Sequence, residues 1–270
     1  MKQMLLAIQF LTIIPVRVKG TLTERELAGA TSFFPFAGAL QGLLMALTAV
    51  AATELFSVEV ACGFVILALL LSNGGFDMDG LMDSFDALAV KSTGNPGRDR
   101  EKRLSVMKDS TVGATGAMAL GMALLLKFVL LLHLFRTFSL PTILCILLLL
   151  PVLSKWVTVP AMYHGTSARR EGLGKIFVEN TRVKDIAVSS LFLLLLYLII
   201  LKVHLYNEYK MGGITLFCFL FLFGYLLALL TAWFTRMKFG GLTGDNLGAL
   251  SEISEILFLM VMPLWLQRST

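Results

Sequence analysis

Charged residues are scarce in this sequence, and cysteine and histidine are scarcer still. Of 270 residues only 15% are Asp, Glu, Lys or Arg, whereas 57% are hydrophobic, and the mean hydropathy is +0.81. Because soluble domains carry about 25% charged residues, this composition excludes an ordinary soluble domain and indicates a membrane protein. The three cysteines stand singly in apolar runs, which argues against a disulfide framework and against a structural zinc site.

A cleavage site for a signal peptide is also lacking. Residues 4–16 (MLLAIQFLTIIPV) begin like a signal peptide, but no small-residue cleavage motif follows them, so we expect no cleavage. This stretch is shorter than the ~20 residues that a spanning helix needs. It predicts a short interfacial or re-entrant helix at the N-terminus.

Long apolar runs are abundant. They are continuous and not alternating, which predicts membrane helices and excludes the strands of a barrel. We therefore expect an all-α polytopic membrane protein with about seven transmembrane helices, forming one integral-membrane domain over residues 1–270. The two shorter runs, 58–73 and 251–266, cross only if the helix continues beyond them. The expected spans are 33–56, 58–73, 112–135, 139–163, 185–206, 213–235 and 251–266.

The basic residues are distributed unevenly between the two sides that these spans define. Seventeen of the 23 Lys and Arg residues fall on one side, in Lys2 and the loops 17–30, 91–110, 164–184 and 236–248. The positive-inside rule makes that side cytoplasmic and predicts a multi-pass protein of the cytoplasmic (inner) membrane. The net charge of +5 thus reflects topology and not a nucleic-acid partner. The sequence indicates no particular oligomeric state.

An acidic motif follows the second apolar run. Residues 74–86 read GGFDMDGLMDSFD and hold Asp77, Asp79, Asp83 and Asp86. The paired glycines predict a break, with a helix resuming near Met78. At 100° per residue Asp79, Asp83 and Asp86 lie within about 60° of one another, and Asp77 lies off this face.

Three like charges on one helix face destabilise a helix, and a divalent cation removes that conflict. Mg²⁺ prefers carboxylate oxygens, water and substrate phosphates, so the motif predicts a Mg²⁺ site at Asp79, Asp83 and Asp86. The alternative is a solvated acidic face at a membrane exit.

Three other segments supply basic residues suited to a phosphate ligand, and a fourth supplies a candidate metal ligand or base. RDREKRLSVMKDS (98–110) is basic and ends in Lys-Asp, LSKW (153–156) places a lysine inside a span, ARREGLGKIF (168–177) is a basic loop, and FGGLTGDNLGALSEISE (239–255) follows a glycine turn. Intramembrane charge more often faces a cavity or a partner than lipid. Glu252 and Glu255 enter the last span and are assigned no role. The candidate residues are Arg103, Lys108, Asp109, Lys155, Arg169, Arg170 and Asp245.

Together these motifs resemble those of the cobalamin (5′-phosphate) synthase family, the adenosylcobinamide-GDP ribazoletransferases. GGFDMDGLMDSFDAL followed by RLSVMKDSTVGATG carries most of the likeness. QFLTIIPV, FFPFAGALQG, LSKW, REGLG and GGLTGDNLGALSEISE add to it in the same order along the chain.

The resemblance implies that α-ribazole or its 5′-phosphate attacks adenosylcobinamide-GDP with release of GMP and a requirement for Mg²⁺. Asp79, Asp83 and Asp86 match acidic positions of the family, and from their chemistry we assign them to Mg²⁺. We further expect catalytic roles, as base, metal ligand or hydroxyl activator, for Asp77, Asp109 and Asp245. Substrate contacts are expected from Arg103, Lys108, Lys155, Arg169 and Arg170.

The sequence departs from the family pattern at three positions. Asp77 stands where histidine is usual, Lys155 where arginine is common, and Ala87 where glycine follows the acid. An ionised Asp77 cannot donate or shuttle a proton as a neutral histidine does, so either the family's histidine is not the essential base or Asp77 binds metal in its place. A lysine at 155 also lacks the bidentate grip of arginine on phosphate.

Three other functions compete with this reading. A CDP-alcohol phosphotransferase would require an arginine that is missing after DGLM, and a UbiA-type prenyltransferase would require a second Asp-rich motif. A transporter of cations or corrinoids would place carboxylates near the bilayer midplane and show internal repeats.

Overall fold

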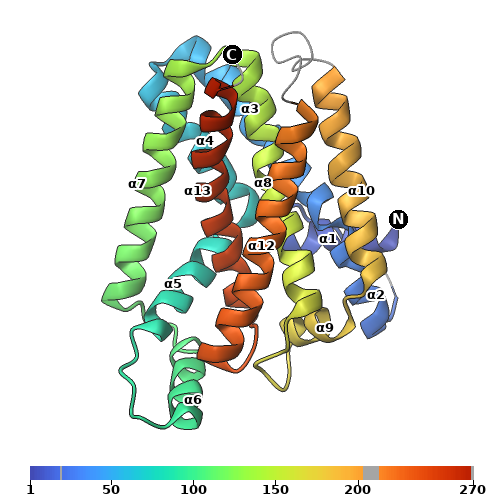
Figure 1. Ribbon diagram of the computed structural model, residues 1–270, viewed down its shortest axis with the longest axis vertical. Helices are drawn as coiled ribbons and strands as arrows, with labels where there is room; N and C mark the ends of the chain where they lie inside the picture. Colours follow the sequence, from blue (N-terminus) through green and yellow to red (C-terminus); the bar gives the residue numbers. More distant parts are fainter. Residues whose placement is uncertain (19, 203–212, 269–270) are drawn as a thin grey trace.

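The computed structural model describes residues 1–18, 20–202 and 213–268, which form a bundle of α-helices (Figure 1). Within these residues six helices are long and apolar enough to cross a membrane, and α4 and α5 together make a seventh, bent candidate. The predicted all-α polytopic fold is confirmed. The helices are α1 (Lys2–Leu11), α2 (Glu24–Ala28), the 3-10 helix η1 (Gly29–Phe33), α3 (Phe34–Leu55), α4 (Val58–Asn73), α5 (Phe76–Leu88), α6 (Pro96–Val106), α7 (Ala114–Thr137), α8 (Leu140–His164), α9 (Leu173–Asn180), α10 (Val183–Ile200), α12 (Gly213–Phe239) and α13 (Gly244–Arg268).

The predicted spans agree closely with the helices. α3, α7, α8 and α12 begin and end within four residues of the prediction, whereas α13 begins at Gly244 and not at residue 251. α1 has ten residues, about 15 Å of helix, which is too short to cross a bilayer and confirms the short N-terminal helix. The end of the predicted span 185–206 lies outside the described residues, as do Lys19 and Lys210.

α8 is the central helix of the bundle. It packs against α3, α10, α12 and α13, and its side chains from Leu149 to Met162 are all buried. α3 approaches it closely through Gly38 and Gly42, where a Cβ would come within 2.4 Å of the Pro151 oxygen and 2.5 Å of the Leu148 oxygen. Small residues four apart on a membrane helix permit this kind of close packing.

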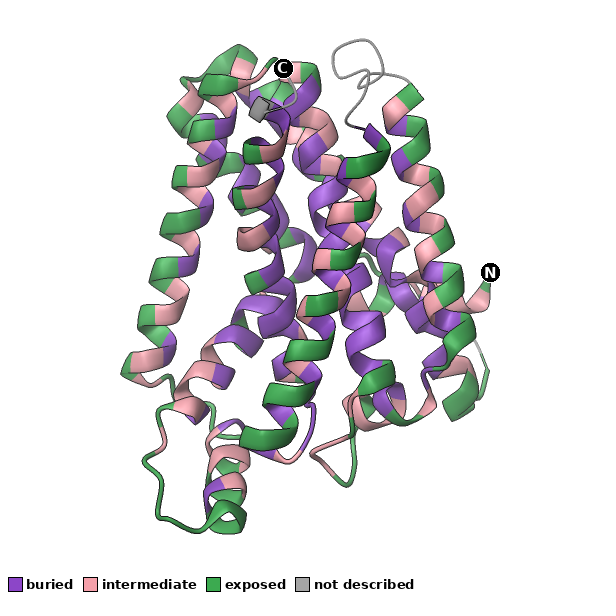
Figure 2. Cartoon of the chain, in the orientation of Figure 1, coloured by how far each residue is buried: buried purple, intermediate pink, exposed green. Residues whose placement is uncertain are grey.

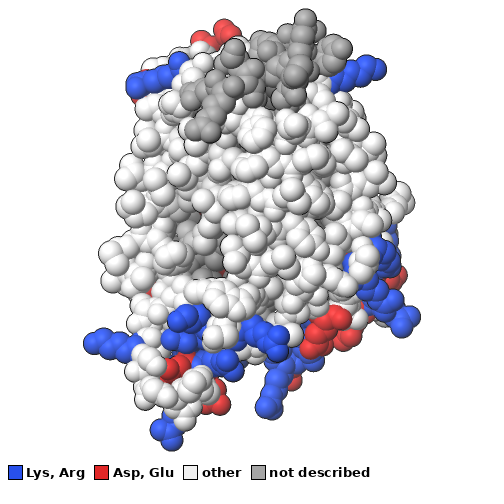
Figure 3. Space-filling model, in the orientation of Figure 1, with Lys and Arg blue, Asp and Glu red and all other residues white. Residues whose placement is uncertain are grey.

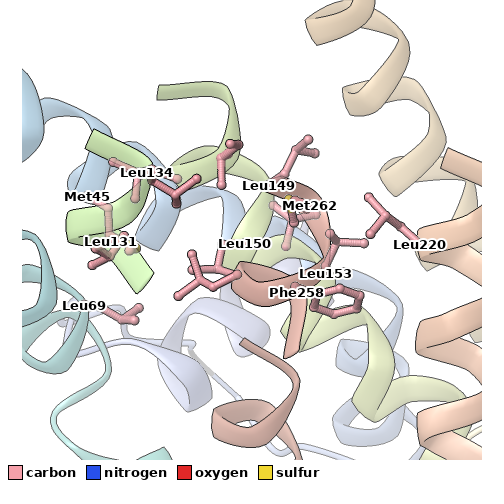
Figure 4. Packing of buried hydrophobic residues seen from close by; sticks show 14 of the residues in the cluster. Met45, Leu69, Leu131, Leu134, Leu149, Leu150, Leu153, Leu220, Phe258 and Met262 are labelled. Carbon is pink, nitrogen blue, oxygen red and sulfur yellow. The ribbon is translucent and has the colours of Figure 1, made fainter. Parts of the chain in front are cut away.

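The largest apolar core lies around α8, where side chains from seven helices meet. Figure 4 shows Leu69 and Leu131 beside Leu150, with Phe258 and Leu220 farther along the same cluster. The opposite faces of the outer helices are apolar as well but exposed (Figure 2).

The outer surface matches a protein that spans a membrane. On the face that Figure 3 shows, the middle is almost free of charged side chains, and Lys, Arg, Asp and Glu gather at the two ends. Large side chains such as Leu126, Leu195 and Leu222 are exposed around the middle. A continuous exposed apolar surface of this kind is expected to face lipid.

Candidate active site

Two glycines turn the chain sharply between α4 and α5. Gly74 and Gly75 have φ angles of +66° and +77°, which residues with a Cβ rarely adopt. The side-chain oxygen of Asn73 accepts a hydrogen bond from the Gly75 N–H at 2.9 Å. The two helices meet at 87°, so α5 lies across the bundle (Figure 1). The predicted break is confirmed, but α5 begins at Phe76 and not near Met78, which places Asp77 inside the helix.

α5 packs against the start of α13 because both helices carry a glycine at the contact. A Cβ on Gly80 would lie 2.6 Å from the Asp245 carbonyl oxygen, and one on Gly248 would lie 3.1 Å from the Cα of Asp77. The contact brings Asp83 within electrostatic reach of Asp245 as well as of its neighbours Asp79 and Asp86. Carboxylates far apart in the sequence thus share one region.

We expect Gly80→Ala to lower the free energy of unfolding by about 1–3 kcal/mol, because the added methyl meets backbone that cannot rotate away. Gly121→Ala in α7 is the matched control, since a Cβ there meets nothing within 4 Å. In that variant the better helix propensity of alanine should leave stability unchanged or raise it by up to about 1 kcal/mol. Thermal unfolding in detergent measures both, and equal stability of the two variants would contradict the tight α5–α13 contact.

A cavity of about 320 Å³ opens beside this contact. Four predicted site residues line it: Asp77 and Asp79 from α5, Lys155 from α8 and Asp245 from α13. The rest of the wall is mostly apolar or glycine and includes the packed rings of Phe34 and Phe177, whose centroids are 5.7 Å apart. A cavity with apolar walls and a few convergent charged groups is the usual form of a small-molecule site.

Asp77 is the ion-pair partner of Lys155. The ammonium of Lys155 contacts Asp77 Oδ2 and donates to Ser251 Oγ at 2.8 Å, and the Asn73 amide donates to the same Asp77 oxygen at 2.8 Å. Side-chain exposure is 2% for Lys155 and 12% for Asp77. The intramembrane lysine thus faces both a partner and a cavity, as the sequence predicts. Asp77 and Lys155, which both depart from the family pattern, contact each other.

Arg169 does not line the cavity, but it pairs with Asp245, which does, with 2.7 Å between Nη2 and Oδ2. Two loops hold the pair together: Leu242 N–H donates to the Thr166 oxygen at 2.7 Å, and Ala168 N–H donates to the Leu242 oxygen at 3.0 Å. Both side chains stay partly exposed, at 29% and 24%. Arg170, next in the chain, is exposed and does not line the cavity.

Asp86 binds the beginning of α7. Its two carboxylate oxygens accept the backbone N–H groups of Gly113 and Gly116, each at 2.7 Å. A Cβ on either glycine would come within 2.4 Å of that carboxylate, so the glycines leave room for it. A carboxylate at a helix N-terminus satisfies free N–H groups and the helix dipole. This contact gives Asp86 a structural role that the helix-face argument did not predict.

The basic loop 91–110 contributes less to the cavity than we predicted. Arg103 of α6 donates to the Lys238 carbonyl at 2.9 Å and so binds the last turn of α12. Lys108 and Asp109 are exposed and line no part of the cavity. The hydroxyl and the N–H of Thr111 donate to Asp109 and lower the pKa of its carboxyl, which makes it a weaker base.

No group of three or more His, Cys, Asp or Glu in the described part of the chain forms a ready-made metal site. The predicted set of Asp79, Asp83 and Asp86 is therefore not a closed cage. Its donors still suit Mg²⁺, which is commonly held by one or two carboxylates together with substrate phosphates and water. Asp79 and Asp245, with Asp83 close by, provide such an open set.

Sequence reasoning assigned no role to a second cluster of charges. Lys127 of α7 lies 2.6 Å from Glu252 and 2.5 Å from Glu255 of α13, and all three are almost fully buried. The signal was visible in the sequence as a lysine within one span and two glutamates in another. The sequence alone does not indicate that these two spans are neighbours.

Comparison with known proteins identifies the family of this chain. The family model described as cobalamin-5-phosphate synthase matches residues 3–263. A relative from Thermodesulfovibrio yellowstonii, named adenosylcobinamide-GDP ribazoletransferase, is 36% identical over 95% of this chain and 94% of its own. Proteins of the same name from Geotalea daltonii (35% identical; 95% and 94%) and Desulfitobacterium hafniense (34%; 96% and 96%) match similarly. No solved structure gives a significant match. The chain belongs to the cobalamin-5-phosphate synthase family.

Proposed function

We propose that the cavity between α5, α8 and α13 is where this chain joins adenosylcobinamide-GDP to α-ribazole or its 5′-phosphate. Family membership and the names of the relatives support the reaction, which is the last assembly step of the cobalamin nucleotide loop. The chain is accordingly a transferase of cobalamin biosynthesis. The observation that carries the location is the convergence of Asp77, Asp79, Lys155 and Asp245 on one cavity wall.

In the reaction the 3′-hydroxyl of the ribazole attacks the phosphorus linked to cobinamide. A new P–O bond forms, the P–O bond to GMP breaks, and GMP leaves with the electron pair while the hydroxyl loses its proton. The cations Lys155 and Arg169 are placed to bind phosphate oxygens, and Asp245 to accept the proton. Positioning and charge neutralisation supply most of the catalysis in such transfers.

Mg²⁺ would be held by Asp79 and Asp83, with Asp245 as a further ligand when it is not acting as base. When bound, the ion neutralises phosphate charge at the reacting phosphorus. The open donor set supports this assignment, since substrate phosphates complete the coordination of Mg²⁺ in many enzymes.

The site would face the cytoplasm across the inner membrane. Most of the visible Lys and Arg side chains gather at the end of the bundle that carries α6 and α9 (Figure 3), and the positive-inside rule assigns that end to the cytoplasm. Cytoplasmic nucleotide substrates could then reach the cavity directly. The comparisons lend no support to the phosphotransferase, prenyltransferase or transporter alternatives.

Purified protein in detergent or liposomes, given adenosylcobinamide-GDP, α-ribazole 5′-phosphate and Mg²⁺, should release GMP and form one complete corrinoid per GMP. Chromatography of both products measures the reaction. Removal of the metal with a chelator should stop turnover, and added Mg²⁺ should restore it. Turnover that persists unchanged after chelation would overturn the metal assignment while leaving the transferase function intact.

We expect Arg169→Gln to tighten the binding of Mn²⁺, used as a probe for Mg²⁺, by about fivefold. The guanidinium and the metal compete for the same Asp245 carboxylate, and a partly exposed pair of this kind is worth up to about 1 kcal/mol. Electron paramagnetic resonance of free Mn²⁺ measures the affinity without any turnover. Arg170→Gln, one residue away and exposed, is the control that should change nothing. Equal affinities in the two variants would show that Asp245 is not a ligand.

A further inference from the structure

A line of buried hydrogen bonds leads from the cavity wall into the bundle. Lys155 Nζ donates to Ser251 Oγ at 2.8 Å, and the Ser251 hydroxyl donates to Ser154 Oγ at 3.4 Å. The Ser154 hydroxyl has two acceptors for its one proton, Glu255 Oε1 at 3.0 Å and the Pro151 carbonyl oxygen at 3.1 Å. All four residues of the line from Lys155 to Glu255 are at most 2% exposed. The line joins α8 and α13 by alternating between them.

A lysine fixes the far end of this line. Lys127 of α7 lies 2.5 Å from Glu255 Oε2, the oxygen that Ser154 does not use, and 2.6 Å from Glu252 Oε2. Both oxygens of Glu255 therefore have partners, and its carboxylate is held in one orientation.

The donors in the line all point the same way. A serine hydroxyl has only one proton. Ser154 therefore accepts the hydrogen bond from Ser251 only when its own proton is donated to another acceptor. Of the two acceptors for that proton, the Glu255 carboxylate is charged and forms a stronger hydrogen bond than the Pro151 carbonyl. Glu255 thus sets the direction of the hydrogen bonds along the line. As a result, an oxygen lone pair of Ser251 faces the Lys155 ammonium.

We propose that Ser251, Ser154 and Glu255 are positioning residues that fix the Lys155 ammonium at the cavity wall, with Lys127 as the counter-ion of Glu255. A lysine ammonium has three donors on a flexible four-carbon stem, so it needs external partners to hold one position. Asp77 and Ser251 supply two of them. The third donor remains for a ligand in the cavity that Lys155 lines, and the chemistry of the ammonium points to a phosphate oxygen.

This inference rests on the proposed function, because its measurable consequence is turnover. A correctly held ammonium acts on charge that develops at the phosphorus, and a small displacement costs more in the transition state than in the bound substrate. A hydroxyl that only packs two helices together would instead affect stability. The two roles therefore predict different results for the same substitution.

Ser251→Thr and Ser251→Val form the test pair, because they add the same volume and differ only in the hydroxyl. We expect the valine variant to have a kcat about tenfold below that of the threonine variant, from the loss of one hydrogen bond to a charged group. The KM for adenosylcobinamide-GDP should agree between the two, whereas the valine variant should also unfold at a somewhat lower temperature, because it leaves a buried ammonium donor without its partner. Ser154→Thr and Ser154→Val should repeat the pattern, since the line passes through both serines.

Ser254→Ala is the matched control: Ser254 is equally buried on α13, and its hydroxyl donates to the Ser251 carbonyl within the same helix. Its kcat should stay within twofold of the unaltered chain. Equal kcat values within either threonine–valine pair would overturn the positioning role of the serines, and so would a loss of stability without a loss of kcat. If the unaltered chain released no GMP, the proposed function itself would fall, which is a distinct result.

Discussion

Replacing Asp83 by asparagine is expected to lower turnover at least ~100-fold while leaving the folded protein in the membrane intact. Asp83 lies among Asp79, Asp86 and Asp245, with Arg169 as the cation that acts on it. The substitution keeps the shape of the side chain but removes the negative charge that a divalent cation would require. Removing one of several mutually repelling charges should also raise stability slightly, so activity and stability should change in opposite directions.

Two measurements separate this prediction from a general defect. GMP release reports activity, and thermal unfolding of the same preparation reports folding. Glu101→Gln removes a carboxylate from the exposed surface of α6 and should affect neither. Near-normal turnover in Asp83→Asn would remove the basis for a metal site on α5, whereas a large loss of stability would show that Asp83 holds the fold together.

Local signals predicted the position of the acidic helix, because the break depends on neighbouring residues only. Gly74 and Gly75 adopt conformations that few other residues tolerate, and α5 follows directly. The helix begins at Phe76 because the Asn73 side chain binds the Gly75 N–H and completes the turn early. Such a side-chain contact shifts a helix start by two residues without changing the hydrophobic pattern from which we predicted it.

The partners of the acidic residues depend on which helices meet, and periodicity carries no such information. Asp86 shares a helix face with Asp79 and Asp83, yet its oxygens bind Gly113 and Gly116 at the start of α7. Asp77 lies off that face and pairs with Lys155, 78 residues away. Lys108 and Asp109 resemble site residues in the sequence but lie exposed in the loop before α7. The sequence identified the types of residue required, and the packing of α5 against α13 decided which ones line the cavity.

The largest effect on stability is expected from Lys127→Met, which should lower the free energy of unfolding by about 3–5 kcal/mol. Lys127 is the cation between Glu252 and Glu255, and the side chains of all three are at most 2% exposed. Methionine leaves two buried carboxylates without a counter-charge, and the loss of such a charge is far more costly than the pair itself is favourable. The yield of folded protein and its unfolding temperature in detergent measure the effect.

Arg136→Met provides the control on the same helix. Arg136 also makes a 2.8 Å ion pair, with Glu59, but these side chains are 63% and 47% exposed. Exposed pairs contribute about 0–1 kcal/mol, so this variant should be nearly as stable as the unaltered chain. If Lys127→Met cost no more than Arg136→Met, the cluster would have to be open to water and not buried.

A triple variant separates the cost of uncompensated charge from the cost of lost packing. Adding Glu252→Gln and Glu255→Gln to Lys127→Met removes all three charges while keeping side chains of similar size. Buried ionic clusters can be replaced by neutral groups with little loss of stability, so the triple variant should regain most of what Lys127→Met loses. It should not regain full turnover, because the glutamine that replaces Glu255 can donate as well as accept and no longer sets the direction of the Ser154–Ser251 line toward Lys155. Recovery of stability without recovery of turnover would separate the two consequences of this one cluster: the ionic balance that permits folding and the orientation that positions Lys155.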